Sequence, residues 1–357
     1  MIGVAFNAQD GAGLDESLDE LARLAQTAGA RVAARLAQKR PRPDIKYFIG
    51  EGKAAELQEL LVEHNANLLI FDSELTASQT RNLEELLATK VIDRTELILD
   101  IFALHAHSRE GKLQVELAQA EFTLTHLSGH GVSMSRLGGG IGTRGPGETK
   151  LEYDRRRARR RISELKYEIE KVRRERSLRR DKRRGSRLPV AAIVGYTNSG
   201  KSTLLNYLTN AGVLVEDKLF ATLDTTTRRF RLPGGRVILI SDTVGFIRKL
   251  PHQLVAAFQA TLEEVAEADL LLHVVDISQP NYEDQIAAVY QVLEELKCAT
   301  KPLITIFNKT DLLAEPIKEK ILRKYQPAVS ISALTGAGLT ALGPLLERQL
   351  AAASSAR

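Results

Sequence analysis

The chain has 357 residues, of which 43% are hydrophobic and 27% are charged, and this composition excludes a disordered or fibrous protein and favours two or three globular domains. Its single cysteine, Cys298, excludes an internal disulfide and indicates a reducing compartment. The longest apolar run, near Leu270–Val275, is too short to cross a bilayer, and the N-terminus lacks a secretory signal pattern, so we expect a cytoplasmic protein with no membrane span.

Strand-like and helix-like segments alternate through residues 1–100. This alternation predicts a small α/β domain with a largely parallel sheet. Gly50-Glu51-Gly52-Lys53 lacks the spacing of a phosphate-binding loop, so we interpret it as a turn that opens a helix; a phosphate contact at that helix start is the alternative. The predicted strands are Ile2–Phe6, Arg31–Ala37, Lys46–Ile49, Leu68–Phe71 and Val91–Ile92, and the predicted helices lie near Glu16–Ala28, Lys53–Glu63 and Ser78–Ala88.

Residues 101–187 contain two heptad seams separated by a glycine-rich segment. Apolar residues recur at intervals of four, three, four and three in both seams, so two helices can bury these faces against each other as an antiparallel hairpin. The connection, 128–150, is too rich in glycine to be helical, and a loop of this length is usually functional or disordered. The seams are Leu113, Leu117, Ala120, Leu124 and Leu127, and Ala158, Ile162, Leu165, Ile169 and Val172.

Positive charge is concentrated on the second of these helices and the segment that follows it. Between Arg155 and Arg187 there are seventeen Lys or Arg and five Asp or Glu. A solvated helix surface is the ordinary interpretation of a charge run. Here so few acids compensate the charge that we expect a polyanion, namely folded RNA contacted through its phosphates and shape. Scarce aromatic residues around the loop argue against stacking on a single strand. The candidate RNA contacts are Arg136, Arg144, Lys150, Arg155, Arg156, Arg157, Arg159, Arg160 and Arg161.

The segment Gly195–Ser202 follows an apolar run and precedes a helical pattern. Strand, glycine-bounded loop, Lys-Ser and helix in this order form a P-loop, in which backbone N–H groups and the helix N-terminus face one phosphate group. Lys201 is placed to reach the terminal phosphates, and the Ser202 hydroxyl is placed to ligate the accompanying Mg²⁺. The predicted nucleotide contacts in this loop are Gly195, Tyr196, Thr197, Asn198, Ser199, Gly200, Lys201 and Ser202.

A second pattern, Asp242-Thr243-Val244-Gly245, follows the apolar run Arg236–Ile240. A DxxG sequence at a strand end, after a P-loop, is typical of nucleotide-dependent switch proteins. We expect Asp242 to hold Mg²⁺ through water and the Gly245 N–H to meet the γ-phosphate.

A third pattern, Asn308-Lys309-Thr310-Asp311, follows the apolar run Lys301–Phe307. The Asp311 carboxylate can accept hydrogen bonds from N1–H and the exocyclic amine of guanine. Adenine has no donor at N1, so this residue type at this position selects guanine.

A fourth pattern, Ser332-Ala333, lies in a late loop where a backbone N–H can meet guanine O6. Four patterns in this order, each at a predicted strand end, identify a GTP-binding domain. A P-loop kinase is a distant alternative, because it would need neither Asn308 nor Asp311.

Switch I must lie between the P-loop and Asp242, and its threonine completes the Mg²⁺ shell when GTP is bound. Thr222 and Thr226 are the candidates. Many GTPases place a water-orienting glutamine directly after DxxG, but this chain has Phe246 and then Ile247. Neither side chain can orient a water, so we expect slow hydrolysis by the chain alone and name no catalytic base. The predicted switch I contacts are Phe220, Ala221, Thr222, Leu223 and Asp224.

Three segments carry a resemblance to the HflX family of ribosome-associated GTPases, in the Obg-HflX group: Gly138–Glu152 with the arginines after it, Phe220–Asp224 and Asp242–Ile247. The resemblance extends over essentially the whole chain. In relatives of the Obg type the switch threonine matches Thr222, which favours Thr222 over Thr226 as the Mg²⁺ ligand. The resemblance implies binding to the large (50S) ribosomal subunit, a loop that reaches toward the peptidyl-transferase region, and splitting or rescue of stalled ribosomes under stress. Some members of the family also accept ATP.

The sequence thus predicts an α/β protein with three parts: an N-terminal α/β domain (1–100), a long antiparallel two-helix hairpin (101–187) and a P-loop GTPase domain (188–357). We expect a monomeric, Mg²⁺-dependent GTPase that binds GTP or GDP, contacts the large subunit and its rRNA, and is stimulated by the ribosome. One alternative is an RNA-associated GTPase for assembly or modification. Another is a GTPase whose arginine helix docks on acidic protein or lipid headgroups.

Overall fold

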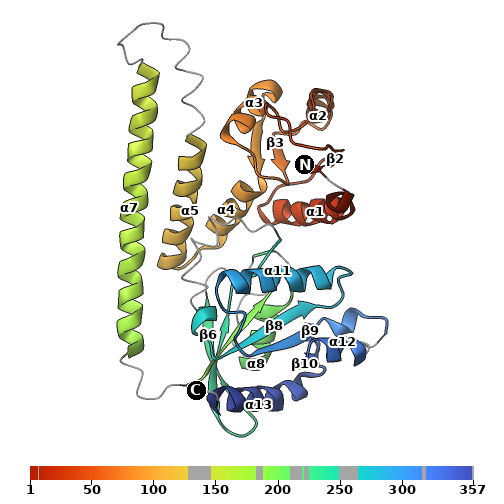
Figure 1. Cartoon of the computed structure of the whole chain (residues 1–357), viewed down its shortest axis with the longest axis vertical. Coiled ribbons are helices and arrows are strands. Elements are labelled where there is room, and N and C mark those ends of the chain that lie inside the picture. The colour runs from red at the N-terminus through yellow and green to blue at the C-terminus, as the bar shows by residue number, and fades with distance from the viewer. Residues whose placement is uncertain are drawn as a thin grey trace. The chain divides into compact units, whose positions relative to one another are not determined.

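The computed structural model of the chain is drawn in Figure 1. Its described part divides into two compact units, the first formed by Met1–Leu104 and Lys112–Lys171, and the second by His105–Gly111 and Val172–Arg357. None of the described helices has the length and apolar composition needed to cross a membrane. The structure describes residues 1–6, 8–127, 146–181, 188–209, 219–220, 225–248, 264–315 and 319–355.

The first unit opens with a small α/β domain. Its elements are β1 (Ile2–Ala5), α1 (Ala8–Thr27), β2 (Leu36–Lys39), α2 (Glu51–Glu63), β3 (Leu68–Phe71), α3 (Ala77–Leu87), β4 (Lys90–Asp93) and α4 (Arg94–His105). The four strands pair in the order β2-β1-β3-β4, and every pairing is parallel. Ile2, Phe71 and Leu83 are fully buried in one cluster that joins the sheet to α2 and α3. The predicted α/β architecture is confirmed in this part of the chain.

Strand β2 begins at Leu36, so the prediction of a strand over Arg31–Ala37 was wrong in position. Its partner β1 begins at Ile2, which pairs with Leu36 in register. The Leu36 N–H donates a hydrogen bond to the carbonyl of Met1, and residues before Leu36 therefore have no strand beside them. The location of the strand follows from its partner, which a local pattern cannot reveal.

The predicted strand Lys46–Ile49 was also wrong, because the segment forms a turn. Asp44 Oδ1 accepts hydrogen bonds from the N–H groups of Lys46 and Tyr47, an arrangement that curls the backbone after an aspartate. The only pairing here is an isolated bridge between Asp44 and Phe48. The turn leads directly into α2, as expected for the glycine-containing segment at its start.

Two long helices follow, α5 (Arg109–Leu127) and α7 (Pro146–Asp181), and they lie side by side (Figure 1). Leu117 of the first predicted seam is buried, and so are Leu165 and Ile169 of the second. The predicted seams thus contribute to the buried faces of both helices, and Val115 and Ala118, which lie outside the first seam, are buried as well.

The second unit is a six-stranded sheet with helices on both faces. Its elements are β5 (Val190–Gly195), α8 (Lys201–Thr209), β6 (Thr226–Arg231), β7 (Val237–Asp242), β8 (Leu270–Asp276), α11 (Tyr282–Glu295), β9 (Leu303–Asn308), η4 (Thr310–Leu312), α12 (Glu319–Lys324), β10 (Ala328–Ser330), η5 (Leu339–Ala341) and α13 (Leu342–Ser355). The strand order is β10-β9-β8-β5-β7-β6, and only β6 is antiparallel to its neighbour. Strand β5 lies between β7 and β8, so the chain departs to both sides of it. Ligands bind at the carboxyl ends of strands at such a switch point.

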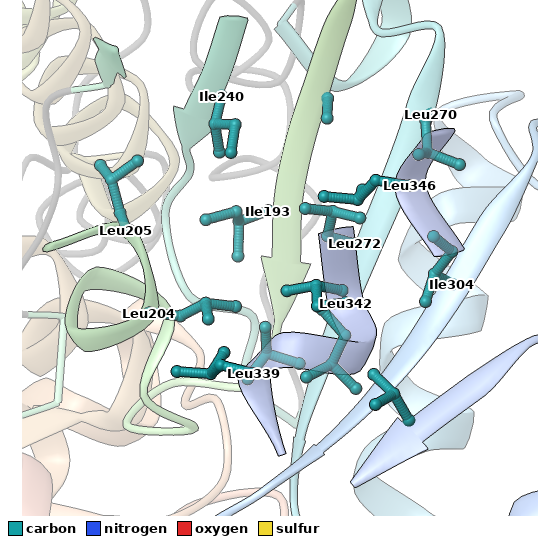
Figure 2. Packing of buried hydrophobic residues seen from close by; sticks show 14 of the residues in the cluster. Ile193, Leu204, Leu205, Ile240, Leu270, Leu272, Ile304, Leu339, Leu342 and Leu346 are labelled. Carbon is teal, nitrogen blue, oxygen red and sulfur yellow. The ribbon is translucent and has the colours of Figure 1, made fainter. Parts of the chain in front are cut away.

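Alternate residues of these strands fill two cores. Figure 2 shows Ile193 of β5 and Leu272 of β8 packed against Leu204 of α8 and Leu342 of α13. On the other face, Phe307 of β9 belongs to a second cluster with residues of α11 and α12. Strands β8 and β9 contribute buried residues to both clusters and are thus anchored on both faces, which fixes the loops at their carboxyl ends.

Candidate functional site: a nucleotide edge and an arginine face

The loop between β5 and α8 approaches the end of β9 closely. Gly200 has a φ of 93°, and a Cβ at this position would lie 2.2 Å from Asn308 Nδ2. Only glycine tolerates both the left-handed backbone and this approach. Gly200, which is part of the sequence pattern that predicts a P-loop, is therefore also required by the conformation of this loop.

Lys201 begins α8, and its side chain is buried. Its ammonium donates hydrogen bonds to the carbonyls of Tyr196 at 2.8 Å and Gly195 at 3.3 Å. Burial lowers the pKa of Lys201 to about 8, and the charge of Lys309 adds to this effect while Asp242 opposes it. A phosphate group beside the amine would favour its charged form and raise the pKa again. The loop therefore holds a desolvated cation at the position where an anion is predicted to bind.

Ser202 and Asp242 bring two oxygen donors together at the carboxyl edge of the sheet. Ser202 Oγ donates a hydrogen bond to Asp242 Oδ2 at 2.6 Å, and Asp242 is fully buried at the end of β7. Hydroxyl and carboxylate oxygens suit Mg²⁺, which prefers oxygen ligands and keeps several waters. These residues fit the predicted roles, with Ser202 as a direct ligand and Asp242 acting through water. When bound, the ion would neutralise charge on the phosphates.

Gly245 lies directly against the P-loop. A Cβ at this position would lie 2.7 Å from Thr197 Cα and 3.0 Å from Lys201 Nζ, so glycine is needed for the close approach. The next residue, Phe246, donates its N–H to the Gly195 carbonyl at 3.0 Å and accepts from the Thr197 N–H at 2.7 Å. The predicted γ-phosphate contact is therefore tied by backbone hydrogen bonds to the loop that would hold the phosphates.

The residues around Gly245 are buried. Thr243 donates its hydroxyl to the Ile193 carbonyl at 2.6 Å, and Val244, Phe246 and Ile247 are all buried. A water-orienting side chain must face the phosphates, whereas the Phe246 side chain is enclosed by protein. This burial agrees with the expectation that neither Phe246 nor Ile247 orients the attacking water.

Asn308 joins two loops of the nucleotide edge. Its Nδ2 donates to the Ser199 carbonyl at 2.9 Å, its Oδ1 accepts from the Ala333 N–H at 2.8 Å, and the residue is buried. In the loop where a backbone N–H is predicted to meet guanine O6, the Ala333 N–H is therefore bound by Asn308. Ser332 beside it is fully buried. Asn308 thus connects the P-loop to the loop that carries the predicted base contact.

Lys309 and Asp311 occupy opposite environments after β9. Lys309 has a φ of 64°, and its ammonium pairs with Asp276 Oδ2 at 2.8 Å. Asp276 ends β8 and is buried; sequence reasoning missed it, although an aspartate at a strand end was the available signal. Asp311 is exposed, as a carboxylate that receives a base must be. Thr310 donates its N–H to the Ile331 carbonyl at 3.3 Å, which joins this segment to the last loop.

Only Phe220 of the predicted switch I contacts lies within the described residues. It has a φ of 59°, and its N–H donates to Thr197 Oγ1 at 2.9 Å, so the start of switch I is tied to the P-loop. Ala221, Thr222, Leu223 and Asp224 lie outside the described residues. Thr226, the second candidate for the switch threonine, begins β6 and pairs in register with Asp242. The choice of Thr222 stays a prediction.

A carboxylate that the sequence did not single out connects strand β7 to the segment after the predicted switch I residues. Glu264 accepts hydrogen bonds from the hydroxyls of Ser241, Thr225 and Thr227. Ser241 is fully buried in β7, and Thr225 directly follows the predicted switch I residues. The hydroxyl-bearing residues on β6 and β7 could have indicated an acceptor, but their partner is distant in sequence.

The predicted RNA-contacting arginines of α7 differ in their surroundings. Arg161 pairs with Glu116 of α5 at 2.6 Å, and Lys166 pairs with Glu121 of α5 at 2.8 Å. Arg161 therefore helps to join the two helices, and Arg155 is half-buried. The exposed arginines, which we define as the arginine face of α7, are Arg156, Arg157, Arg159 and Arg160.

The remaining predicted RNA contacts lie in or next to the glycine-rich segment. Arg136 and Arg144 are outside the described residues. Lys150 lies within α7, but its side chain belongs to the part that the structure does not describe. These three contacts stay predictions.

Three family profiles match the chain in succession. The first is described as "GTP-binding GTPase N-terminal" and matches residues 15–103. The second is "GTP-binding GTPase Middle Region" and matches residues 105–183. The third is "50S ribosome-binding GTPase" and matches residues 190–309. Together they cover most of the chain, from residue 15 to residue 309, and place a GTPase domain over β5 to β9.

Relatives of known family have similar sequences over most of this chain. The GTPase HflX of Caldanaerobacter subterraneus subsp. tengcongensis is 51% identical over 336 residues, which is 94% of this chain and 77% of the relative. The GTPase HflX of Lacrimispora saccharolytica is 52% identical over 97% of this chain and 82% of the relative. Among solved structures, SsGBP in complex with GDP is 26% identical with a TM-score of 0.53, covering 98% of this chain and 97% of that chain.

Proposed function

The chain belongs to the HflX family of GTPases, and on that premise we propose that it couples a guanine-nucleotide switch to binding of the large ribosomal subunit. In this proposal GTP and Mg²⁺ occupy the nucleotide edge, and the arginine face of α7 contacts rRNA. The GTP-bound form binds the 50S subunit and splits or rescues stalled ribosomes in the cytoplasm, or acts in ribosome biogenesis. The chain works as a monomer with the three predicted parts.

One observation carries the nucleotide half of the proposal: three strand ends converge on the P-loop. Lys201 is buried beside two loop carbonyls, Asp242 receives the Ser202 hydroxyl, and Asn308 holds the Ser199 carbonyl. Each of these groups is positioned by hydrogen bonds before a ligand arrives, so little ordering is left for nucleotide binding to supply.

The ribosomal half rests on charge. The arginine face presents four guanidinium groups to solvent, and guanidinium binds phosphate and carboxylate groups by paired hydrogen bonds. The description of the matching family as "50S ribosome-binding GTPase" supports the large subunit as the source of that phosphate.

Cosedimentation with purified subunits tests the partner. We expect the chain to pellet with 50S and not 30S subunits, and more strongly with a non-hydrolysable GTP analogue than with GDP. Equal binding in the two nucleotide states would remove the switch from the proposal. Retained 50S binding after serine replaces the arginine face would instead favour docking on an acidic protein.

A light-scattering assay on 70S particles separates splitting from the alternative of assembly or modification. Loss of scattering on addition of chain and GTP is the expected result. Stable scattering, together with 50S binding, would favour the assembly role.

Base recognition is tested by Asp311→Asn. An asparagine amide complements xanthine better than guanine, because it can donate to the C2 carbonyl of xanthine. We expect affinity to shift from guanine to xanthine nucleotides, and unchanged GTP affinity would contradict the role assigned to Asp311.

A further inference from the structure

Two tyrosines of α7 are unusually exposed for large aromatic residues. The exposed fraction is 63% for Tyr153 and 74% for Tyr167. Single exposed hydrophobic residues are common on protein surfaces, but these two lie on the helix that carries the arginine face. Both tyrosines lie outside the glycine-rich segment 128–150.

The two tyrosines lie on the same side of the helix as two of the arginines. Tyr153, Arg160 and Tyr167 follow one another at intervals of seven residues, and Arg156 falls between the first two. Seven residues are nearly two helical turns, or about 10.5 Å along the axis, so these side chains form one line. We define Tyr153, Arg156, Arg160 and Tyr167 as the tyrosine–arginine stripe.

The stripe lies on the side of α7 that faces away from the seam. Tyr167 is two residues from the buried Leu165, which rotates it by about 200° around the axis, and Arg160 is rotated by about the same angle. The Arg160 side chain is 84% exposed and pairs with Glu164 at 3.2 Å. Packing against α5 therefore leaves the stripe accessible.

Arginine and tyrosine side chains in one line suit a particular ligand. Guanidinium groups bind phosphates, and a tyrosine ring offers a flat face on which a nucleic-acid base can stack. In a fully paired RNA helix the bases are stacked on one another, so a side chain on an α-helix surface meets mainly phosphates and ribose. Stacking on tyrosine requires bases that are unpaired and turned outward.

We propose that the tyrosine–arginine stripe of α7 binds unpaired RNA nucleotides, with Arg156 and Arg160 on phosphates and Tyr153 and Tyr167 stacked on bases. This inference rests on the proposed function, because it requires α7 to contact RNA. It adds that the contacted RNA contains a loop or bulge, and that the contact discriminates such RNA from a continuous duplex.

The test compares two RNAs with the full chain: a perfectly paired duplex, and the same duplex interrupted by a loop of unpaired adenosines. Affinities are measured by fluorescence anisotropy at one salt concentration. We expect the unaltered chain to prefer the interrupted RNA by about fivefold or more for each stacked tyrosine. The variant Tyr153→Leu with Tyr167→Leu should lose this preference and keep its affinity for the duplex.

Phenylalanine at the same two positions is the matched control, because it keeps the ring and removes only the hydroxyl. The phenylalanine variant should retain the preference. Both positions are exposed, so circular dichroism should show the same helix content in all variants.

Two results would overturn the inference while leaving the proposed function intact: no preference in the unaltered chain, or a preference retained by the leucine variant. A different pair of results would overturn the proposed function itself. These are failure of the unaltered chain to bind either RNA, and unchanged binding of both RNAs when serine replaces all four residues of the arginine face.

Discussion

At the nucleotide edge, Lys201 and Asn308 are buried and each donates or accepts two hydrogen bonds, whereas on α7 the Arg160 side chain is 84% exposed and paired with Glu164. The first region is a set of groups that hold one another in place. The second is a row of side chains held by the helix alone. A change to one of several interdependent buried groups disturbs the function of all of them. Exposed charges instead contribute separately to the binding free energy, and salt screens each contribution.

The largest effect is expected at Phe246, where a glutamine would restore the residue type found in many GTPases. Phe246→Gln removes a fully buried aromatic side chain and buries an amide, so we expect a loss of about 3 kcal/mol in unfolding free energy. GTP hydrolysis by the chain alone should not become faster, because the position is enclosed by protein. Urea denaturation and a phosphate-release assay measure the two quantities.

Phe246→Leu serves as the control, with an expected loss of about 1 kcal/mol and the same slow hydrolysis. Accelerated hydrolysis in Phe246→Gln would show that a side chain at this position can reach the attacking water. It would contradict the claim that protein encloses this position.

Gly200→Ala should have the next largest effect. The new Cβ would collide with Asn308 Nδ2 in a backbone conformation with a φ of 93°, so we expect a loss of about 2 kcal/mol in stability. Nucleotide affinity should fall more than tenfold by about the same free energy. Calorimetry of GDP binding measures the affinity.

Gly52→Ala is the matched control, since a Cβ there meets nothing within 4 Å and the residue is helical. We expect it to be neutral or to stabilise the protein by about 0.5–1 kcal/mol. Similar behaviour of the two variants would mean that the P-loop adapts freely, which contradicts the account of the nucleotide edge.

The buried Lys201 should make both the unfolding free energy and the nucleotide affinity of the nucleotide edge depend on pH. Burial lowers its pKa from 10.5 to about 8, so between these values the unfolded state binds one more proton than the folded state. Stability without nucleotide should therefore rise as the pH increases from 8 to 10.5. Nucleotide binding needs the ammonium, so affinity should fall in that window by up to about tenfold per pH unit.

Calorimetry in two buffers with different ionisation enthalpies measures this proton uptake, which should be near one per nucleotide above pH 8 and absent at pH 7. Lys201→Arg stays charged throughout and should lack the effect. Equal uptake by both proteins would assign the proton to another group.

The smallest effects are expected on the arginine face. Arg156→Ser with Arg159→Ser should change the unfolding free energy by less than about 0.5 kcal/mol. Binding to 50S subunits should weaken, and the slope of log affinity against log salt should fall by roughly two, about one for each lost phosphate contact. The control is Lys320→Ser with Arg323→Ser, on the exposed side of α12. An equal change in slope in the control would mean that the total positive charge, and not the arginine face, determines binding to 50S subunits.

Motif residues at strand ends could be predicted because their spacing is local. Gly200, Lys201, Asp242 and Asn308 all lie at the carboxyl edge of one sheet, as the order of patterns along the chain indicates. A phosphate loop encodes its own turn and helix start, so tertiary contacts need not be known to place it.

Features that depend on distant partners could not be predicted. The position of β2 is set by pairing with β1, and the ion pair of Lys309 needs Asp276 from the neighbouring strand. Glu264 meets its hydroxyl partners across β6 and β7. On α7, helical spacing was available in the sequence, but the exposure of Tyr153 and Tyr167 required knowing which face packs on α5.

The most direct test of the account is GTP hydrolysis by the chain alone and with 30S, 50S or 70S particles. Slow hydrolysis alone and with 30S, and large stimulation by 50S, is the predicted result, because the nucleotide edge holds the phosphates but the water-orienting position is occupied by the buried Phe246. Rapid hydrolysis by the chain alone, or equal stimulation by 30S and 50S, would contradict the claim that the large ribosomal subunit stimulates GTP hydrolysis at this nucleotide edge.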